Sequence, residues 1–332
     1  MARLPRRQFL ELAAGAVALP AATRIAGAQT YPARPITVIV PTGAGGPQDV
    51  IARVLAEHMR MTLGQSLIIE NIPGANGTLG VGRVARAKPD GYTIGFSVSS
   101  ATHVFNAALY ALPYDVINDF EPIARATMDS GTLITASRSV PAKDLKEFIA
   151  WLRANPNKAS LGHTGPGSPA HISGALFQQR TNTRFQFVTY RSAGQAMQDV
   201  IAGHIDMMFT SPSIGLTPAR AGSIKAYAVM AKERLLAAPE IPTVDDAGLP
   251  GFYTAGWHAF WAPKGTPRDV IARLNGAVVD ALADPAVRTR LTELGLLIVA
   301  REQQTPVALR AFQKAEIEKW WPIIKEAGIK GE

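Results

Sequence analysis

ITVIVPTGAGGPQDVIARVLAEHM, residues 36–59, joins an apolar β-branched run to a glycine-rich loop and then to a helical pattern. Pro41 closes the apolar run, which has the length and composition of a buried strand. Gly64 lies where a helix following the loop would stop. Between the loop and Gly64, one apolar face recurs at helical spacing, through Val50, Ile51, Val54, Leu55 and Met59. The stretch therefore predicts a strand, a loop and a helix, in that order.

The same order continues outward from this stretch. A second strand is expected at residues 67–69, a second glycine-rich loop at 73–77 and a third strand at 92–98. This alternation of strands and helices is typical of a parallel sheet covered by helices. A similar series recurs between residues 145 and 230. The sequence thus predicts an α/β fold with two units of like organisation.

Length and composition narrow the class of protein. The chain has 332 residues, 47% of them hydrophobic, which fits about two domains with a substantial core. It has no cysteine, which excludes disulfides, thiolate metal sites and cysteine nucleophiles. The formal net charge is +8, but no basic cluster with interleaved aromatic residues indicates nucleic-acid binding.

Residues 1–28 have the features of an export signal. A basic start precedes an uncharged stretch at 12–23, and Ala26-Gly27-Ala28 forms a small-x-small cleavage site. The sequence RRQFL at 6–10 resembles the twin-arginine signal. A basic tail or a short anchor helix is the alternative, although spanning a bilayer takes roughly 20 apolar residues. We expect cleavage after Ala28 and a mature protein in the periplasm.

Two glycine-rich loops are the main candidates for chemistry. The loops at 42–47 and 163–168 each lie between an expected strand and an expected helix. Their glycines expose backbone N–H groups beside a helix N-terminus, an arrangement that favours an anion. Two such loops facing each other would hold a ligand that bears one or two carboxylates. Either loop alone is equally explained as a tight turn, and neither matches a phosphate-binding or dinucleotide-binding motif.

Signatures of catalysis are sparse. The histidines show no metal-binding spacing, and we expect neither a metal nor a cofactor. Ser168 lacks the glycine flanks of a nucleophile elbow and is expected to cap the helix that begins at Pro169. A Ser/His/Asp set assembled in space remains a minor alternative. Asp49, Asp199 and Asp206 are each compatible with binding a ligand amine or with complementing a helix dipole.

Several motifs, taken in order, resemble the periplasmic substrate-binding proteins of tripartite tricarboxylate transporters, the Bug family. The resemblance covers essentially the whole mature chain. Each motif is weak alone, but the order and spacing are specific: 41-PTGAGGPQD-49, 70-ENIPGANGTLG-80, 89-PDGYT-93, 113-PYD-115, 119-DFEPIA-124, 162-GHTGPGSPAH-171, 190-YRSAGQAMQDVIAGHID-206, 241-IPTVDDAG-248 and 262-APKGTP-267.

The resemblance implies a type II periplasmic binding protein fold, in which two doubly wound α/β lobes are joined by a hinge of two crossings. It places residues 29–127 and 228–332 in one lobe and 128–227 in the other. The implied ligand-binding residues of the first lobe are Thr42, Gly43, Ala44, Gly45, Asp49, Gly77, Thr78, Ser97, Ser99 and Thr102. Those of the second lobe are Thr164, Gly165, Gly167, Ser168 and Tyr190, with Asp206 behind them.

The chain also departs from the pattern that its relatives show. Thr42 stands where relatives often carry an aromatic residue, Gln48 where threonine is common, and Ser192 where glycine is frequent. These departures change the expected shape of the ligand, so no relative's ligand is carried over.

The implied function is that of a solute-binding protein without enzymatic activity. It would capture a small carboxylate-bearing ligand between its lobes and deliver it to the membrane permease of a tripartite tricarboxylate transporter. We expect a monomer that binds no nucleic acid. Two alternatives remain at this point: a periplasmic ligand sensor that feeds a signalling partner, and a periplasmic serine hydrolase.

Overall fold

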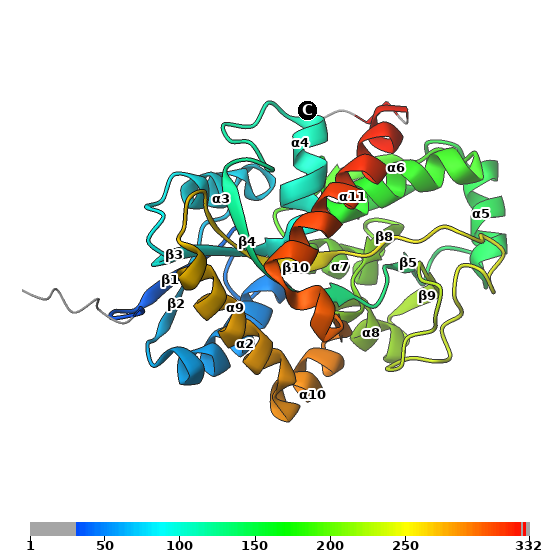
Figure 1. Ribbon diagram of the computed structural model, residues 1–332. Helices are drawn as coiled ribbons and strands as arrows, with labels where there is room; N and C mark the ends of the chain where they lie inside the picture. Colours follow the sequence, from blue (N-terminus) through cyan, green and yellow to red (C-terminus); the bar gives the residue numbers. More distant parts are fainter. Residues whose placement is uncertain (1–30, 327, 330–332) are drawn as a thin grey trace, which may run out of the picture.

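The computed structural model describes residues 31–326 and 328–329, so the predicted export signal lies outside the described residues. Two α/β lobes lie side by side in Figure 1. Lobe 1 comprises the described residues up to 129 and from 257 onward, and lobe 2 comprises residues 133–253. Two short segments, 130–132 and 254–256, connect the lobes and are called the hinge below.

Lobe 1 is built on a sheet that has six strands among the described residues. They are β1 Ile36–Val40, β2 Leu67–Asn71, β3 Thr93–Val98, β4 Phe120–Asp129, β10 Trp257–Pro263 and β11 Leu296–Ile298. Their spatial order is β11-β4-β10-β3-β1-β2. β1 is parallel to β2 and β3, as predicted, whereas β10 runs antiparallel to both of its neighbours. The C-terminal part thus contributes two strands as well as helices.

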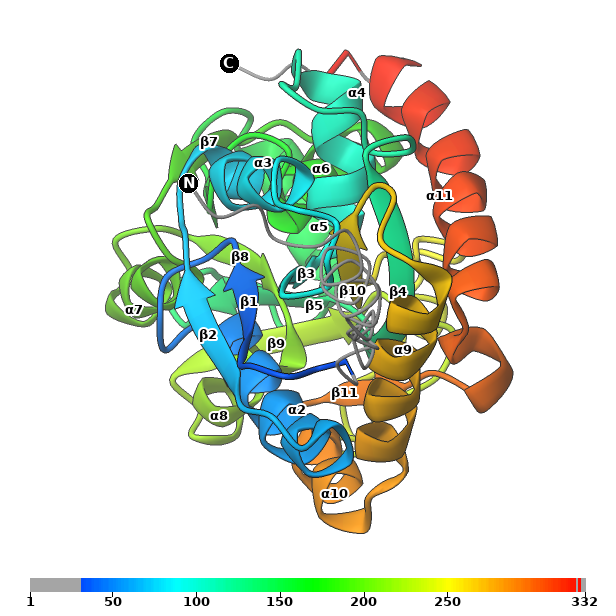
Figure 2. The ribbon, with the colours of Figure 1, turned by 60° about the vertical axis from the view of Figure 1, so that its left-hand side comes forward.

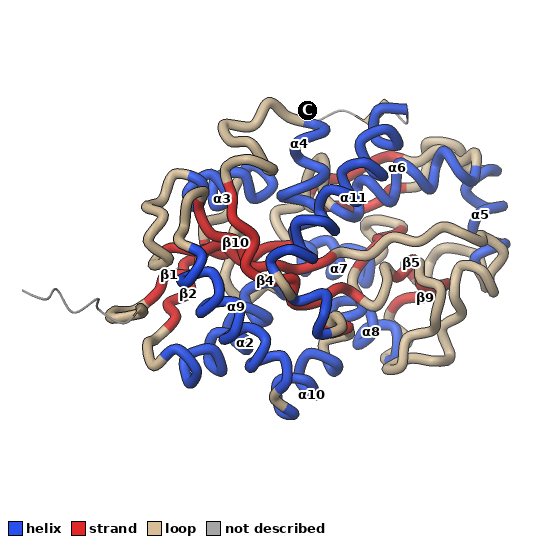
Figure 3. The backbone as a smooth tube through the Cα atoms, in the orientation of Figure 1, coloured by secondary structure: helices blue, strands red, loops and turns tan. Residues whose placement is uncertain are grey.

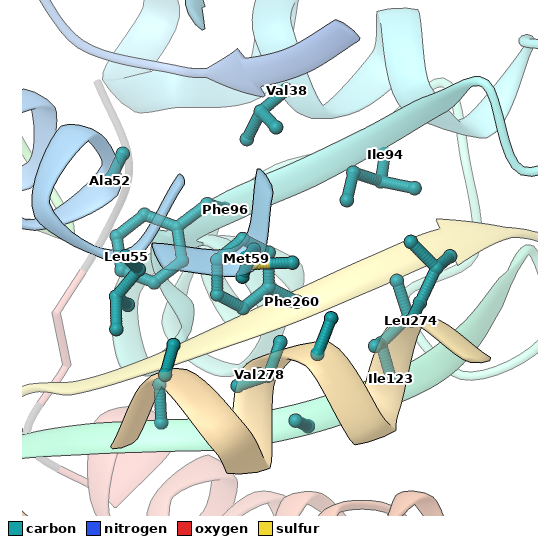
Figure 4. Close-up of a cluster of buried hydrophobic side chains, with 14 of the residues drawn as sticks. Val38, Ala52, Leu55, Met59, Ile94, Phe96, Ile123, Phe260, Leu274 and Val278 are labelled. Carbon is teal, nitrogen blue, oxygen red and sulfur yellow. The ribbon is translucent and has the colours of Figure 1, made fainter. Parts of the chain in front are cut away.

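Helices cover both faces of this sheet. One face carries α2 Pro47–Leu63, α9 Arg268–Ala283 and α10 Pro285–Glu293. Figure 4 shows this core, in which strand residues such as Val38, Phe96 and Phe260 pack against Leu55 of α2 and Leu274 of α9. The other face carries α3 Thr78–Ala85, α4 Asn106–Leu109 and α11 Pro306–Glu326, the last of which lies beside β4 (Figure 2). Short 3-10 turns lie at 75–77 and 301–304, and a π-helical turn lies at 101–105.

Lobe 2 repeats the plan with five strands among its described residues, in the order β7-β6-β8-β5-β9. The strands are β5 Leu133–Ser137, β6 Ser160–His163, β7 Gln186–Thr189, β8 Met207–Thr210 and β9 Ile224–Val229. β6 is parallel to β7 and β8, and β5 is antiparallel to β8 and β9. One face is covered by α5 Leu145–Ala154 and α6 Pro169–Thr181, and the other by α7 Ala193–Ala202 and α8 Pro212–Arg220.

The second boundary between the lobes differs from the one expected at residue 228. Residues 230–253 follow β9 and form a long connection over lobe 2, drawn in tan in Figure 3. Val244, Leu249 and Phe252 from this segment are buried in the core that β5, α5 and α6 share. The segment therefore belongs to lobe 2, because that is where its apolar side chains are removed from water.

The two crossings of the hinge are bonded to each other. The Asp129 N–H donates to the Gly256 carbonyl at 2.8 Å, and the Thr132 hydroxyl donates to the Thr254 carbonyl at 3.0 Å. In the described part of the chain, no helix is both long and apolar enough to cross a membrane.

Candidate functional site

The loop after β1 leads into the exposed N-terminus of α2. The N-cap residue is Gly46, which offers no side chain to cap the helix, and Pro47 is the first helical residue. In the described part of the chain, the N–H groups of Gln48 and Asp49 find no hydrogen-bond acceptor. A helix N-terminus with free N–H groups carries a partial positive charge and favours an anion.

The buried carboxylate of Asp49 holds this loop in place through hydrogen bonds. Its side chain is only 4% exposed, and the carboxylate accepts hydrogen bonds from the Gly45 N–H at 2.9 Å and the Arg53 Nε at 3.0 Å. Burial alone would raise the pKa of Asp49, but the bonds from Arg53 and Gly45 outweigh burial and hold it below the ordinary value. Gly45 has φ 76°, a left-handed conformation that favours glycine. Asp49 therefore fixes the loop, while Gly43 and Ala44 remain exposed.

Three hydroxyl groups near the end of β3 form a buried network rather than a free surface. The Thr102 hydroxyl donates to Ser97 Oγ at 2.9 Å, and Ser97 and Ser99 share a hydrogen bond at 3.3 Å. Ser99 Oγ also accepts from the Trp261 indole N–H at 3.0 Å. The hydroxyl groups of Ser97, Ser99 and Thr102 are thus bonded to one another and to Trp261. Gly77 lies against this network, because a Cβ there would be 3.0 Å from Thr102 Cγ2.

The loop after β6 differs from the expectation that its backbone N–H groups face a ligand. The Gly165 N–H donates to His163 Nδ1 at 3.1 Å, and the Gly167 N–H donates to His171 Nδ1 at 3.2 Å. The Ser168 N–H donates to the Gly165 carbonyl at 3.1 Å. Three N–H groups of the loop are thus bonded within lobe 2, and half-buried Thr164 lies between them and β6.

The predicted helix cap at Ser168 is confirmed. Its hydroxyl oxygen accepts the His171 N–H at the start of α6. Burial, with the neighbouring His163 ring, lowers the pKa of His171 to about 4, which keeps the imidazole a neutral acceptor. This is the geometry of a cap and not of a nucleophile activated by a base. Among the described residues, no group of acidic, histidine or cysteine side chains could hold a metal ion.

Tyr190 and Asp206 both make hydrogen bonds within lobe 2, but only Tyr190 lies at the carboxyl edge of the sheet, where its N–H donates to the His163 carbonyl at 2.8 Å. The Tyr190 hydroxyl donates to Asp199 of α7 at 2.7 Å. Asp206 precedes β8, and its carboxylate accepts from the Ser160 N–H and hydroxyl, both at 2.8 Å. Ser160 begins the parallel strand β6, so Asp206 lies at the opposite edge of the sheet from the loop after β6. Asp206 therefore accepts hydrogen bonds at the amino edge of the lobe 2 sheet, away from the loop after β6.

Direct contacts join the carboxyl edges of the two sheets, and sequence reasoning missed them. Asn76, which follows β2, donates to the Pro166 carbonyl of lobe 2 at 3.1 Å and to Asn106 Oδ1 at 2.8 Å. The Tyr110 hydroxyl donates to the same carbonyl at 2.8 Å. Asn76 has φ 49°, a conformation that asparagine adopts more readily than most residues. An asparagine in a glycine-rich loop was therefore the available signal in the sequence. The loop at 73–77 and the loop at 163–168 thus meet at one junction between the lobes.

Further polar atoms at these strand ends are buried without a partner. Thr42 Oγ1, Gln48 Oε1, Ser100 Oγ and Thr210 Oγ1 have no hydrogen-bond partner among the described residues. Thr42 follows β1, Ser100 follows β3, and Thr210 ends β8. Buried polar atoms are normally satisfied by protein, water or a ligand. Ser100 and Thr210 were not predicted, although a hydroxyl residue at the end of a strand was the signal.

Asp129 brings a carboxyl group to the hinge. Burial raises its pKa to about 7, and a hydrogen bond from the Gly256 N–H offsets only part of this rise. The Asp129 carboxyl group lies close to the Gly256 backbone, because a Cβ at Gly256 would lie 2.5 Å from Asp129 Oδ2. The carboxyl group is therefore poised to titrate near neutral pH at the point where the lobes join.

The sequence and the fold are shared with known proteins. Residues 51–329 match the model of the tripartite tricarboxylate transporter family receptor. This chain belongs to that family. Protein BugT of Bordetella pertussis is 33% identical over 91% of this chain and 92% of its own length. An Agrobacterium vitis relative, a UPF0065 protein, is 38% identical over 90% of this chain and 86% of its own length.

Solved structures of the family agree with the fold. MatC from Rhodopseudomonas palustris, with bound malate, has a TM-score of 0.83 at 38% identity and covers 89% of this chain and 100% of its own. The periplasmic binding protein BugD has a TM-score of 0.82 at 34% identity and covers 91% of this chain and 100% of its own. An R. palustris protein with adipate has a TM-score of 0.84 at 28% identity, covering 91% and 100%. The resemblance to the Bug family and the periplasmic binding protein fold are thereby confirmed.

Proposed function

We propose that this chain is an exported solute-binding protein that captures a small carboxylate-bearing ligand between its lobes and delivers it to the permease of a tripartite tricarboxylate transporter. The observation that supports it most is the uncapped N-terminus of α2, whose free N–H groups follow the carboxyl end of β1. Relatives described with malate and with adipate support the same chemistry.

The proposed mechanism is closure of the lobes around the ligand. A ligand shifts the balance between open and closed forms only if it contacts both lobes. In lobe 1 we assign the ligand to the loop Thr42–Gly46 with Gly77 and Thr78 beside it, and in lobe 2 to the edge that carries Thr164 and Tyr190. Asp206 is left out, because its carboxylate is used at the opposite edge.

A ligand screen tests the proposal. The purified protein is heated with mono-, di- and tricarboxylates, aromatic acids and amino acids, and its unfolding midpoint is recorded. A bound ligand raises the midpoint by mass action, by about 2.7 kcal/mol of stability at a concentration one hundred times the Kd. If no carboxylate raises the midpoint, the proposal fails.

Gly43→Leu tests the α2 site directly. A Cβ at Gly43 meets no atom within 4 Å, and Gly43 does not have a positive φ. The new side chain should therefore obstruct the ligand without straining the fold, and calorimetry should show at least a tenfold loss of affinity. Gly276→Leu, in α9, is the matched control, because its Cβ also meets nothing within 4 Å. Equal affinity in the two variants would contradict the α2 site.

Export by the twin-arginine route is part of the proposal. Replacing Arg6 and Arg7 with lysines removes the pair that defines this signal. We expect the double variant to remain in the cytoplasm with its signal uncleaved, as judged by fractionation and mass. Normal periplasmic recovery of the variant would point to a different export route.

We also propose that the protein acts as a monomer on its permease. Cross-linking in the cell followed by mass spectrometry tests the partner, and sedimentation tests the oligomeric state. Recovery of a sensor kinase instead of a permease would favour the signalling alternative.

A further inference from the structure

The first turn of α2 contains a buried carboxylate beside the N–H groups that we assign to the ligand. Asp49 is the third residue of the helix, and its side chain is 4% exposed. A negative side chain in the first turn of a helix offsets part of the positive charge there. An unpaired Asp49 would therefore oppose the binding of an anion and would attract a ligand amine instead.

Arg53, one turn further along α2, pairs with this carboxylate through two of its nitrogen atoms. Its Nε donates to Asp49 Oδ2 at 3.0 Å, and its Nη2 lies 2.9 Å from Asp49 Oδ1. This is the two-pronged geometry in which a planar guanidinium matches a carboxylate. Burial raises the pKa of Asp49, but the bonds from Arg53 and Gly45 lower it overall, so the carboxylate stays ionised. The pair as a whole is neutral.

The same guanidinium is also linked to the other end of the loop. Arg53 Nη2 donates to Asn71 Oδ1 at 3.5 Å, and Asn71 Nδ2 donates to the Thr42 carbonyl at 3.1 Å. Asp49 accepts the Gly45 N–H at 2.9 Å. The loop is thus held near both of its ends by side chains that contact Arg53. In the described part of the chain, Arg53 makes its side-chain hydrogen bonds to these two residues.

We propose that Arg53 is a specificity-determining residue, which neutralises Asp49 so that the α2 site accepts a carboxylate and rejects an amine. Arg53 is a positioning residue, because it acts through Asp49 and Asn71 and needs no contact with the ligand. This inference rests on the proposed function and adds to it the residue that sets the charge of the site. It also decides between the two roles open to Asp49 in the sequence, since its carboxylate is already paired.

Arg53→Met is the direct test, because methionine keeps an unbranched apolar stem and removes the charge. Calorimetry measures affinity for propionate, succinate and adipate, and for their 2-amino counterparts alanine, aspartate and 2-aminoadipate. We expect the preferred plain acid to bind at least about fivefold more weakly at low salt, with a smaller loss at high salt, because ions screen the charge left on Asp49. The amino counterpart should gain on the plain acid, since the unpaired carboxylate attracts its ammonium group.

A double variant, Arg53→Met with Asp49→Asn, separates charge from support of the loop. Asparagine keeps an oxygen for the Gly45 N–H and removes the negative charge. The double variant should therefore recover most of the affinity that Arg53→Met loses. Arg53→Lys, which keeps the positive charge, should likewise bind the plain acid more tightly than Arg53→Met does.

Arg60→Met is the matched control. Arg60 also lies in α2, its side chain is 52% exposed against 53% for Arg53, and its Nη2 lies 2.6 Å from Glu57 Oε1. The substitution removes the same charge from the same helix, but about three turns from Asp49. Affinity for the plain acid and for its amino counterpart should both stay within about twofold of wild type, since charges more than about 10 Å apart are largely screened.

Three results would overturn the inference. The first is an equal loss of affinity in Arg53→Met and Arg60→Met, which would assign the effect to net charge. The second is a double variant that binds as weakly as Arg53→Met, because Arg53 would then not act through the charge of Asp49. The third is a wild-type protein that binds none of the six compounds. The proposed function would survive the first two results, and after the third it would depend on the wider ligand screen alone.

Discussion

Burial in the folded protein moves the pKa of the Asp129 carboxyl group toward neutral pH. In the folded protein its pKa is raised to about 7, mainly by burial, whereas an unfolded aspartate titrates near about 3.9. Between these two pH values the folded state binds more protons than the unfolded state. Stability therefore falls as the pH rises from about 4 to about 7 and stays reduced above that.

Asp129→Asn should remove this dependence, because the amide is neutral and its oxygen still accepts the Gly256 N–H. At pH 8 we expect the variant to unfold about 2–4 °C above wild type, the shift that about 1 kcal/mol produces in a large domain. Near pH 4 the two proteins should agree. Thermal unfolding by circular dichroism at both pH values measures the difference, and an equal difference at both would refute the assignment.

Single residues show where sequence reasoning succeeds and where it stops. The Ser168 cap was predictable, because a serine before a proline-started helix acts through its own backbone neighbours. The roles of Asp206 and Tyr190 were not, since their partners Ser160 and Asp199 are set by how strands and helices meet. The unpartnered Thr210 hydroxyl depends on tertiary packing in the same way.

At the scale of elements, α3 is held close to the end of β1 by a glycine. A Cβ at Gly80 would lie 2.8 Å from Pro41 Cβ and 2.9 Å from the Ile72 carbonyl oxygen. Gly80→Ala should push α3 away and displace Gly77 and Thr78 with it. We expect a loss of about 1–3 kcal/mol in the free energy of unfolding, measured in urea, together with weaker ligand binding.

Gly82→Ala, two residues further along the same helix, is its control. There the nearest atom to a new Cβ is Arg86 Nη1 at 3.2 Å, the end of a flexible side chain. Alanine favours a helix interior over glycine by roughly 0.5–1 kcal/mol, so Gly82→Ala should be at least as stable as wild type. If the two variants proved equally stable, close packing of α3 against Pro41 and Ile72 would not be what requires glycine at position 80.

The helices and strands whose apolar residues recur at regular spacing were predictable from the sequence. The strands and helices around residues 36–98 follow the order read from the sequence, and α2 stops at Gly64 as expected. Residues 230–253 have no such periodic pattern, so their attachment to lobe 2 depends on the buried positions of Val244, Leu249 and Phe252. Strands β10 and β11 of the C-terminal part were missed, because their pairing is with β3 and β4, distant in sequence.

For the whole molecule, Asn76 makes one of the two hydrogen bonds to Pro166 that join lobe 1 to lobe 2, and Tyr110 makes the other. The Asn76 side-chain amide donates to both the Pro166 carbonyl and Asn106. Asn76→Ala removes these bonds, each worth about 0.5–1.5 kcal/mol net, and should shift the unliganded protein toward an open form. Small-angle scattering should then show a larger radius of gyration, and affinity should fall about two- to tenfold because the closed form is less populated.

Asn118→Ala is the comparison for this prediction. The Asn118 side chain donates to Asp115 at 2.8 Å within lobe 1, so its loss leaves the contact between lobes intact. Both scattering and affinity should match wild type. An Asn76→Ala protein that behaved in the same way would show that the bond from Asn76 to the Pro166 carbonyl does not hold the lobes together.

The order of the strands also has a consequence for biosynthesis. Lobe 2 is a continuous segment, and all of its strands are synthesised before residue 257. Lobe 1 cannot close so early, because β10, residues 257–263, lies between β3 and β4 and is antiparallel to both. Until that strand arrives, the first 129 residues have two unfilled sheet edges. The N-terminal lobe is therefore the last to be completed, and its nascent edges are the part of this chain most in need of protection during synthesis.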